Sequence, residues 1–288
     1  MTAKAACARI TAARSAPGPA SAAITCSDIS CDDWDRTLGL LAGAVVLIGY
    51  YLVHERFLAA DPLMPLSLWR NRSVAGANVV SALLSSAVFA MFYSTTLYQQ
   101  QVLGYSALRT GLAYIPLGLS ILVAAGLGPV MVPRLGVRLT TAIGSLIGTA
   151  GMVLLIGLPV PADLLTHLIV PEVIVGFGTG MAFIPSSIAA LAGVPASRSG
   201  VASALLNVSR QLGGALGLAA ISTVVATQTT HALATGHAVA TAMTTGFHAG
   251  FAVSSVLVAA SVVAALTLLR EDGRGRAVNL IDLQTAGA

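Results

Sequence analysis

The sequence predicts an all-α polytopic membrane protein, and three observations point to this fold class. Of the 288 residues, 56% are hydrophobic and only 9% are charged, and the mean hydropathy is +0.86. Soluble domains carry about a quarter charged residues, so this chain has too few charges to cover a surface in water. Charge-free runs also follow one another along the chain. This composition excludes a cytosolic enzyme, a nucleic-acid-binding module and a secreted disulfide scaffold.

Seven membrane spans follow from the positions of the charges, because a helix that crosses a bilayer needs about 20 mostly apolar residues. The run from 73 to 108 holds one span before the polar residues 98–101, and the runs 110–133 and 139–162 hold one each. The run 164–197 contains a single charge, and the polar stretch 227–237 divides the last apolar run into two spans. The expected helices are 37–54, 74–97, 109–131, 139–158, 165–190, 201–226 and 246–269.

The arginines orient these spans. In alternate loops, one set holds nine arginines, namely Arg56, Arg70, Arg72, Arg134, Arg138, Arg198, Arg270, Arg274 and Arg276, whereas the other set holds only Arg109. Because basic residues concentrate on the cytoplasmic side, the first set is expected in the cytoplasm. The sequence therefore predicts a multi-pass protein of the cell membrane with a cytoplasmic C-terminus and a cytoplasmic tail at 271–288. The net charge of +4 serves this orientation, and no nucleic-acid partner is predicted.

Residues 1–36 carry no chemistry that we recognise. They are rich in alanine, serine and arginine, and their first acidic residue is Asp28. This composition favours disorder over an organellar targeting segment, and a third interpretation is that the stretch is not native to the domain that follows. All three cysteines, Cys7, Cys26 and Cys31, lie in this segment and indicate neither a zinc site nor a disulfide framework.

Several motifs occur in a set order along the chain. They are His54–Arg56 with Pro62–Leu66, Gln101–Leu108 with Thr110–Leu112, Arg134–Arg138, Gly176–Gly180 and Asn207–Gly217. In this order they resemble the C-terminal half of the fourteen-span drug:proton antiporter branch of the major facilitator superfamily, over about residues 34–270. The resemblance implies one linker transmembrane helix with its connector at 37–73, then a six-helix C-terminal transporter half at 74–270. The loop with Arg134, Gly136 and Arg138 resembles a cytoplasmic gating loop, although Pro133 stands where the fuller motif has an acidic residue.

The resemblance implies proton-driven export of small amphiphilic compounds by alternating access, without a cofactor. The partners it implies are the lipid bilayer, substrates, protons, and a missing N-terminal half or a second copy of the chain. The alternative is a truncated, non-transporting membrane protein or a regulatory partner of a full-length transporter. No enzyme is expected, because no nucleophile elbow, zinc-binding helix or P-loop occurs.

Two charges within the spans are candidate functional residues. Glu172 is the only carboxylate within the last six predicted spans, and such a group is a candidate proton or cation site by default. Desolvation favours its neutral form, as a proton carrier requires. The alternative is that Glu172 reaches interfacial water from near the outer helix end. Arg210 lies deep in the span 201–226 and either pairs with an anion or a helix carbonyl, snorkels to the cytoplasmic face, or contacts substrate.

Polar and aromatic residues supply the remaining candidates. Phe89 and Tyr93 suit either a cavity for bulky apolar or cationic substrates or contact with lipid. Asn207 and Gln211 flank Arg210 and are candidates for the same path, whereas Tyr98 and Tyr105 are expected in an interfacial aromatic belt. Glycine pairs four residues apart, Gly144/Gly148, Gly176/Gly180 and Gly213/Gly217, predict close helix packing. His231, His237 and His248 are widely spaced in a predicted loop, so no metal site is expected.

Overall fold

A computed structural model describes residues 39, 42–44, 46–47, 49–50, 71–159, 164–192 and 194–269. The chain divides into two units, Met1–Pro65 and Leu66–Ala288. In the first unit, the described residues between 39 and 50 are helical. The rest of the predicted linker helix 37–54, the N-terminal segment 1–36, its connector up to 70 and the tail 271–288 lie outside the described residues. All that follows concerns the second unit.

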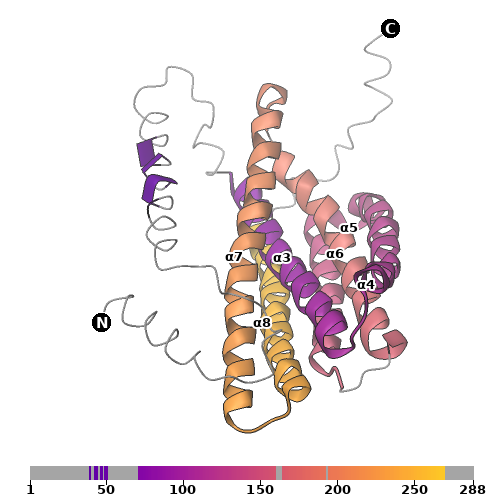
Figure 1. The fold of residues 1–288 in the computed structure, drawn as a ribbon. Coiled ribbons are helices and arrows are strands. Elements are labelled where there is room, and N and C mark those ends of the chain that lie inside the picture. Colours follow the sequence, from indigo (N-terminus) through magenta and orange to yellow (C-terminus); the bar gives the residue numbers. More distant parts are fainter. Residues whose placement is uncertain are drawn as a thin grey trace. The chain divides into compact units, whose positions relative to one another are not determined.

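The described part of the second unit is built from helices. They are α3 (Arg72–Leu97), the π-helix η2 (Tyr98–Val102), α4 (Ala107–Ala113), α5 (Ile115–Ile156), the π-helix η3 (Leu164–Ile169), α6 (Val170–Leu191), the short 3-10 helix η4 (Ala196–Arg198), α7 (Ser199–Ala234) and α8 (Val239–Leu268) (Figure 1). Five of the described helices are long and apolar enough to cross a membrane. The prediction of an all-α polytopic membrane protein is confirmed.

Helix α5 contains two spans. Its 42 residues would measure about 63 Å if straight, roughly twice the hydrocarbon thickness of a bilayer. Gly136 interrupts the helical backbone with φ 81° and ψ 162°, a conformation that is essentially restricted to glycine. The segments on either side of Gly136 correspond to the predicted spans 109–131 and 139–158. The predicted loop at 134–138 is therefore a kink centred on one residue.

Helix α6 packs against both segments of α5. A Cβ atom at Gly144 would lie 2.8 Å from the amide nitrogen of Ala182, and one at Gly180 would lie 2.7 Å from the carbonyl oxygen of Ile121. Backbone contact this close is open only to glycine, because any side chain would force the helices apart. The close packing predicted from the glycine spacing is thus confirmed for α5 and α6.

The second close contact joins α7 to α3. Gly213 lies against Ala82 and Gly217 lies against Ser86, one helical turn further along both helices. The Ser86 hydroxyl group donates a hydrogen bond of 2.6 Å to the Gly213 carbonyl oxygen. These contacts advance together along the two helices, so α3 and α7 run parallel. Figure 1 shows α3 beside α7 and α8, with α6 beside α5.

The turn between α7 and α8 differs from its prediction. The polar stretch 227–237 was expected to be a loop, but α7 continues to Ala234 and α8 already begins at Val239. Threonine side chains in this stretch bond to carbonyl groups of their own helix, as Thr227 does to Thr223 at 2.8 Å, and so compensate for their polarity. Gly236, with φ 87°, then ends the helix, and its N–H group bonds to the Leu233 carbonyl group.

Candidate functional site

The first feature of the site is a buried carboxyl group at the start of α6. Glu172 is 1% exposed, and neither of its carboxyl oxygens has a hydrogen-bond partner within the described part of the chain. Close packing explains the burial, because a Cβ atom at Gly151 of α5 would lie only 3.0 Å from the Pro171 carbonyl oxygen. The alternative was that Glu172 reaches interfacial water from near the helix end. In this conformation its side chain is buried instead.

Hydroxyl groups from α3 and from the residue between α4 and α5 meet near this carboxyl group. Thr95 of α3 is a polar side chain near Glu172 but makes no hydrogen bond to it in this conformation, and Tyr114, the residue between α4 and α5, interacts with it electrostatically. The Tyr114 hydroxyl lies 2.7 Å from the Thr95 hydroxyl and 2.8 Å from the Thr96 hydroxyl. We refer to Thr95, Thr96 and Tyr114 as the hydroxyl cluster.

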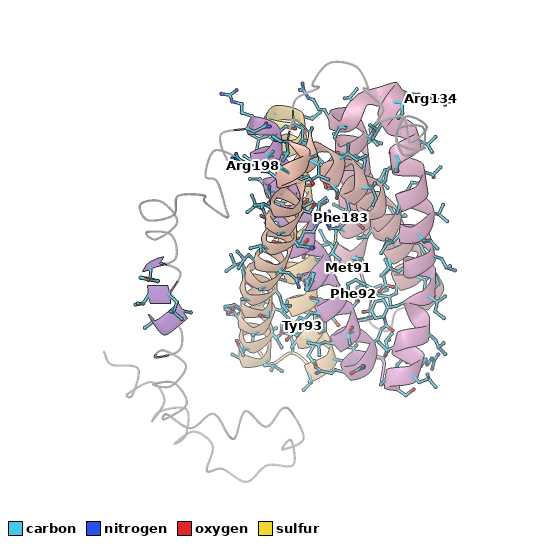
Figure 2. The ribbon with its side chains drawn as sticks, turned by 90° about the horizontal axis from the view of Figure 1, so that it is seen from above. Met91, Phe92, Tyr93, Arg134, Phe183 and Arg198 are labelled. Carbon is cyan, nitrogen blue, oxygen red and sulfur yellow. The ribbon has the colours of Figure 1, made fainter. Side chains whose placement is uncertain are left out.

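The hydroxyl cluster extends from the buried carboxyl group to the exposed aromatic side of α3. The Tyr114 hydroxyl donates to the Phe92 carbonyl oxygen at 3.2 Å, and the two rings lie 5.0 Å apart between centroids. Phe89, Phe92 and Tyr93 are 37–44% exposed. Phe89 also covers Gly214 of α7, since a Cβ atom there would lie 3.0 Å from the phenylalanine ring. Figure 2 shows Phe92 and Tyr93 in the lower half of the bundle in that view.

Tyr98 does not belong to an interfacial belt. Its side chain is fully buried, it lies edge-on to Phe247 with centroids 6.1 Å apart, and its hydroxyl group donates to the Pro159 carbonyl oxygen at 2.9 Å. The belt prediction was wrong for Tyr98 because helix α8 covers the ring. Tyr105 is partly exposed and carries the Arg109 guanidinium 3.8 Å above its ring centre.

Arg210 joins α7 to α6. One terminal nitrogen of its guanidinium group donates to the Ser187 hydroxyl at 2.7 Å and to the Phe183 carbonyl oxygen at 3.4 Å. The same group lies 4.9 Å from the centre of the Phe183 ring. Of the alternatives left open by the sequence, the structure therefore shows Arg210 bound to a helix carbonyl and a hydroxyl group. Its neighbours Asn207 and Gln211 are exposed, one turn apart on the same helix.

The structure does not bring Glu172 and Arg210 together. Arg210 binds Ser187, which is 15 residues along α6 from Glu172 or about 22 Å at 1.5 Å per residue. Arg134 and Arg198 both lie toward one end of the bundle, on opposite sides of it, whereas Tyr93 lies toward the other end (Figure 2). Both Arg134 and Arg138 are exposed, on either side of the kink at Gly136.

The histidines occupy three different settings. His231 belongs to α7 and His248 to α8, while His237 lies in the turn between them, so only His237 is in a loop. A ring nitrogen of His248 lies 2.7 Å from the Leu158 carbonyl oxygen. No group of three possible metal ligands occurs among the described residues.

Sequence reasoning missed the partners of the two charges. Thr95, Tyr114 and Ser187 look like ordinary polar residues of apolar segments, and no spacing rule connects them to Glu172 or Arg210. The one available signal was that a buried charge requires polar neighbours, which pointed to their existence but not to their positions.

The fold and this site together define a class, that of polytopic helical membrane proteins with ionisable groups buried between their spans. A sequence profile of the Major Facilitator Superfamily matches residues 16–218. The chain belongs to this superfamily, and it is an integral membrane protein with several transmembrane helices.

Similar proteins include three with roles in resistance or export. The puromycin resistance protein pur8 of Streptomyces alboniger is 36% identical over 189 residues, which are 64% of this chain and 37% of the relative. The cephamycin export protein CmcT of Amycolatopsis lactamdurans is 32% identical over 191 residues, 66% of this chain and 39% of that protein. A multidrug resistance protein B homolog of Mycobacterium tuberculosis is 30% identical over 207 residues, which are 72% of this chain and 38% of that protein. The chain thus spans less than two fifths of these relatives.

Proposed function

We propose that residues 74–270 form the C-terminal half of a proton-driven exporter of small amphiphilic compounds in the cell membrane. The observation that carries the proposal is the set of packed spans between Arg72 and Leu268, in a chain of the Major Facilitator Superfamily. Relatives named for puromycin resistance and cephamycin export support the substrate class. In the complete transporter, this bundle would face a second six-helix bundle, and the two would rock about a cavity between them.

The side of the bundle that faces this cavity is formed by α3 and α7. Asn207 and Gln211 are exposed on α7, and an amide group in contact with lipid tails is costly because it finds no hydrogen-bond partner there. These residues therefore belong on a hydrated surface. Phe89 and Tyr93 are exposed on the neighbouring helix α3 and add aromatic faces, which attract apolar and cationic compounds.

The arginines support the proposed orientation of the bundle. Arg134 and Arg198 lie at the same end of the described bundle (Figure 2), as the positive-inside rule requires of cytoplasmic residues. The proposal places the C-terminus in the cytoplasm and the turn after α7 outside. It can be tested with a chain in which the three natural cysteines are changed to serine. In intact cells, a membrane-impermeant thiol reagent should label His237→Cys but not Arg198→Cys.

Transport is tested in two arrangements of the full chain. In proteoliposomes with a proton gradient, the chain alone should not export puromycin. A second protein joins this chain to the part of the puromycin resistance protein that precedes the matched region. This fusion should export puromycin, and only while the gradient is maintained. Export by a chain shown to be monomeric would overturn the half-transporter assignment. A well-folded fusion without export would favour the alternative, a non-transporting membrane protein or a regulatory partner.

A further inference from the structure

We propose that Glu172, Thr95 and Tyr114 form a proton-binding site, which exchanges its proton with the exposed aromatic side of α3 through the Tyr114 hydroxyl group. The use of this site in coupling rests on the proposed export function, whereas proton binding itself does not. A carboxyl group that is 1% exposed has no hydrogen-bond partner for either oxygen within the described residues.

No described basic residue bonds to the Glu172 carboxyl oxygens. Arg72 at the start of α3 is exposed, and Arg109 of α4 is exposed and lies over the Tyr105 ring. Arg210 is the nearest basic residue along the interface of α6 with α7, and it is bound to Ser187 about 22 Å further along α6. Arg134, Arg138 and Arg198 border the kink and the loop at the opposite end of the helices. A buried charge without a partner is strongly disfavoured, so the site is built to hold a carboxylic acid.

The other described titratable groups on the elements around α6 either have partners of their own or are exposed. On α8, His248 lies against the Leu158 carbonyl oxygen, and in η2, Tyr98 is bound to Pro159. His167 of η3 is exposed and has an interaction of its own. Tyr93 is exposed on α3. Tyr114 is the described titratable side chain that interacts electrostatically with the Glu172 carboxyl group.

The neighbouring hydroxyl groups suit a proton better than a metal cation. A hydroxyl group donates one hydrogen bond and accepts others, so Thr95 can accept from a protonated Glu172 or donate to an ionised one. Thr95 now donates to the Met91 carbonyl oxygen at 2.8 Å, and this hydrogen can turn toward a carboxylate. A calcium ion takes six to eight oxygen ligands and magnesium an octahedral shell of six, more than the roughly five oxygens that one carboxyl group and three hydroxyl groups provide.

The same contacts supply a path for the proton. When the Glu172 carboxylate becomes a carboxylic acid, it takes the hydrogen of Thr95, and Thr95 takes that of Tyr114 across their 2.7 Å contact. Tyr114, which is half-buried, takes a proton from hydronium at the exposed side near Phe92. Both hydroxyl groups finish with the one hydrogen they had, and the net result is one proton moved from water to Glu172.

Infrared titration of the full chain in lipid nanodiscs tests the site without requiring transport. The sequence contains only three glutamates, Glu55, Glu172 and Glu271, so carbon-13 labelling of glutamate reports on very few groups. The band of a protonated carboxyl group should shift with this label, lose intensity as the pH rises, and vanish in Glu172→Gln. The variants Glu55→Gln and Glu271→Gln should retain it. Because the label needs no substitution, the assignment to glutamate stands even if Glu172→Gln fails to fold.

Two further variants test the hydroxyl groups. Thr95→Val should move the band to higher frequency, because the carboxyl group loses its hydrogen-bond acceptor. Tyr114→Phe should slow proton uptake after a pH jump at least tenfold, whereas the control Tyr105→Phe should leave the rate unchanged. A band insensitive to the glutamate label, an unmoved band in Thr95→Val or unchanged kinetics in Tyr114→Phe would each overturn the proposal. Removal of the band by sodium at constant pH would also overturn it, in favour of a cation site.

The outcome separates this site from the proposed function. If the band behaves as expected and the fusion with the puromycin resistance protein does not export, the proton site stands and the export proposal fails. If the fusion exports with the same dependence on the gradient in Glu172→Gln as in the parent, the coupling role of Glu172 fails while export stands.

Discussion

The substitution Gly144→Ala tests the packing that holds α5 and α6 together. In the sequence, Gly144 and Gly148 form an apparently equivalent pair, but the structure separates them. A Cβ atom at Gly144 would lie 2.8 Å from the Ala182 amide nitrogen and 2.8 Å from the Gly178 carbonyl oxygen. A Cβ atom at Gly148 would be 3.6 Å from its nearest neighbours, the side chains of Thr179 and Val258.

The magnitude follows from these distances. The optimal separation of non-bonded atoms is about 3.5 Å, so Gly144→Ala requires the two helices to move apart locally by about 0.7 Å. A gap of this size removes about a quarter to a half of the dispersion energy of the surrounding contacts. Because the clashing atoms belong to the backbone of α6, no side-chain rotation relieves the clash. We expect Gly144→Ala to lower the free energy of unfolding by about 1–3 kcal/mol.

The control is Gly148→Ala, four residues further along the same helix. Its Cβ atom would enter ordinary van der Waals contact, and alanine is the better helix former by about 1 kcal/mol. Gly148→Ala should therefore be neutral or stabilising. The free energy of unfolding is measured by circular dichroism during titration of the full chain with dodecyl sulfate in mixed micelles. Equal stability of the two variants would refute the packing described for α5 and α6.

Three more substitutions test other parts of the bundle by the same titration. Gly136→Ala should cost about 1–3 kcal/mol, because its backbone conformation at the kink of α5 is strained for any residue with a Cβ atom, and an unchanged stability would contradict the kink. Ser187→Ala and Arg210→Lys, combined in a double-mutant cycle, should show a coupling energy of about 0.6–2 kcal/mol, and additive effects would contradict their hydrogen bond. Tyr98→Phe should cost about 1 kcal/mol through loss of the bond to Pro159, and an unchanged stability would contradict that bond.

Much of this fold could be predicted because lipid imposes strict requirements on sequence. A spanning helix must be long and apolar, so the charges alone located the spans between 74 and 269 to within a few residues in most cases. The largest error came at 227–237, where polarity was interpreted as a loop. Threonines that bond to carbonyl groups of their own helix allow a polar segment to continue as helix, and hydropathy does not register this compensation.

The candidate site was predictable only in part. Glu172 and Arg210 were found because a charge within an apolar run is rare and visible in one sequence. Their partners were not found, because Thr95 and Glu172 are brought together by the packing of α3 against α6, which the local sequence does not encode. The belt prediction for Tyr98 was wrong for the same reason, since its burial depends on Phe247, distant in the chain.

Several polar contacts of this bundle lie along one seam, where α3 and α7 meet α6. Glu172 and the hydroxyl cluster lie toward one end of it, Ser81 and Ser186 share a contact of 3.2 Å further along, and Arg210 bonds to Ser187 near the latter. By contrast, the backbones of α5 and α6 interlock through glycines, and so do those of α3 and α7. Hydroxyl groups exchange hydrogen-bond partners after small displacements, whereas close backbone contacts resist them. We therefore expect relative movement of the helices to be easier at these hydroxyl contacts than at the glycine contacts.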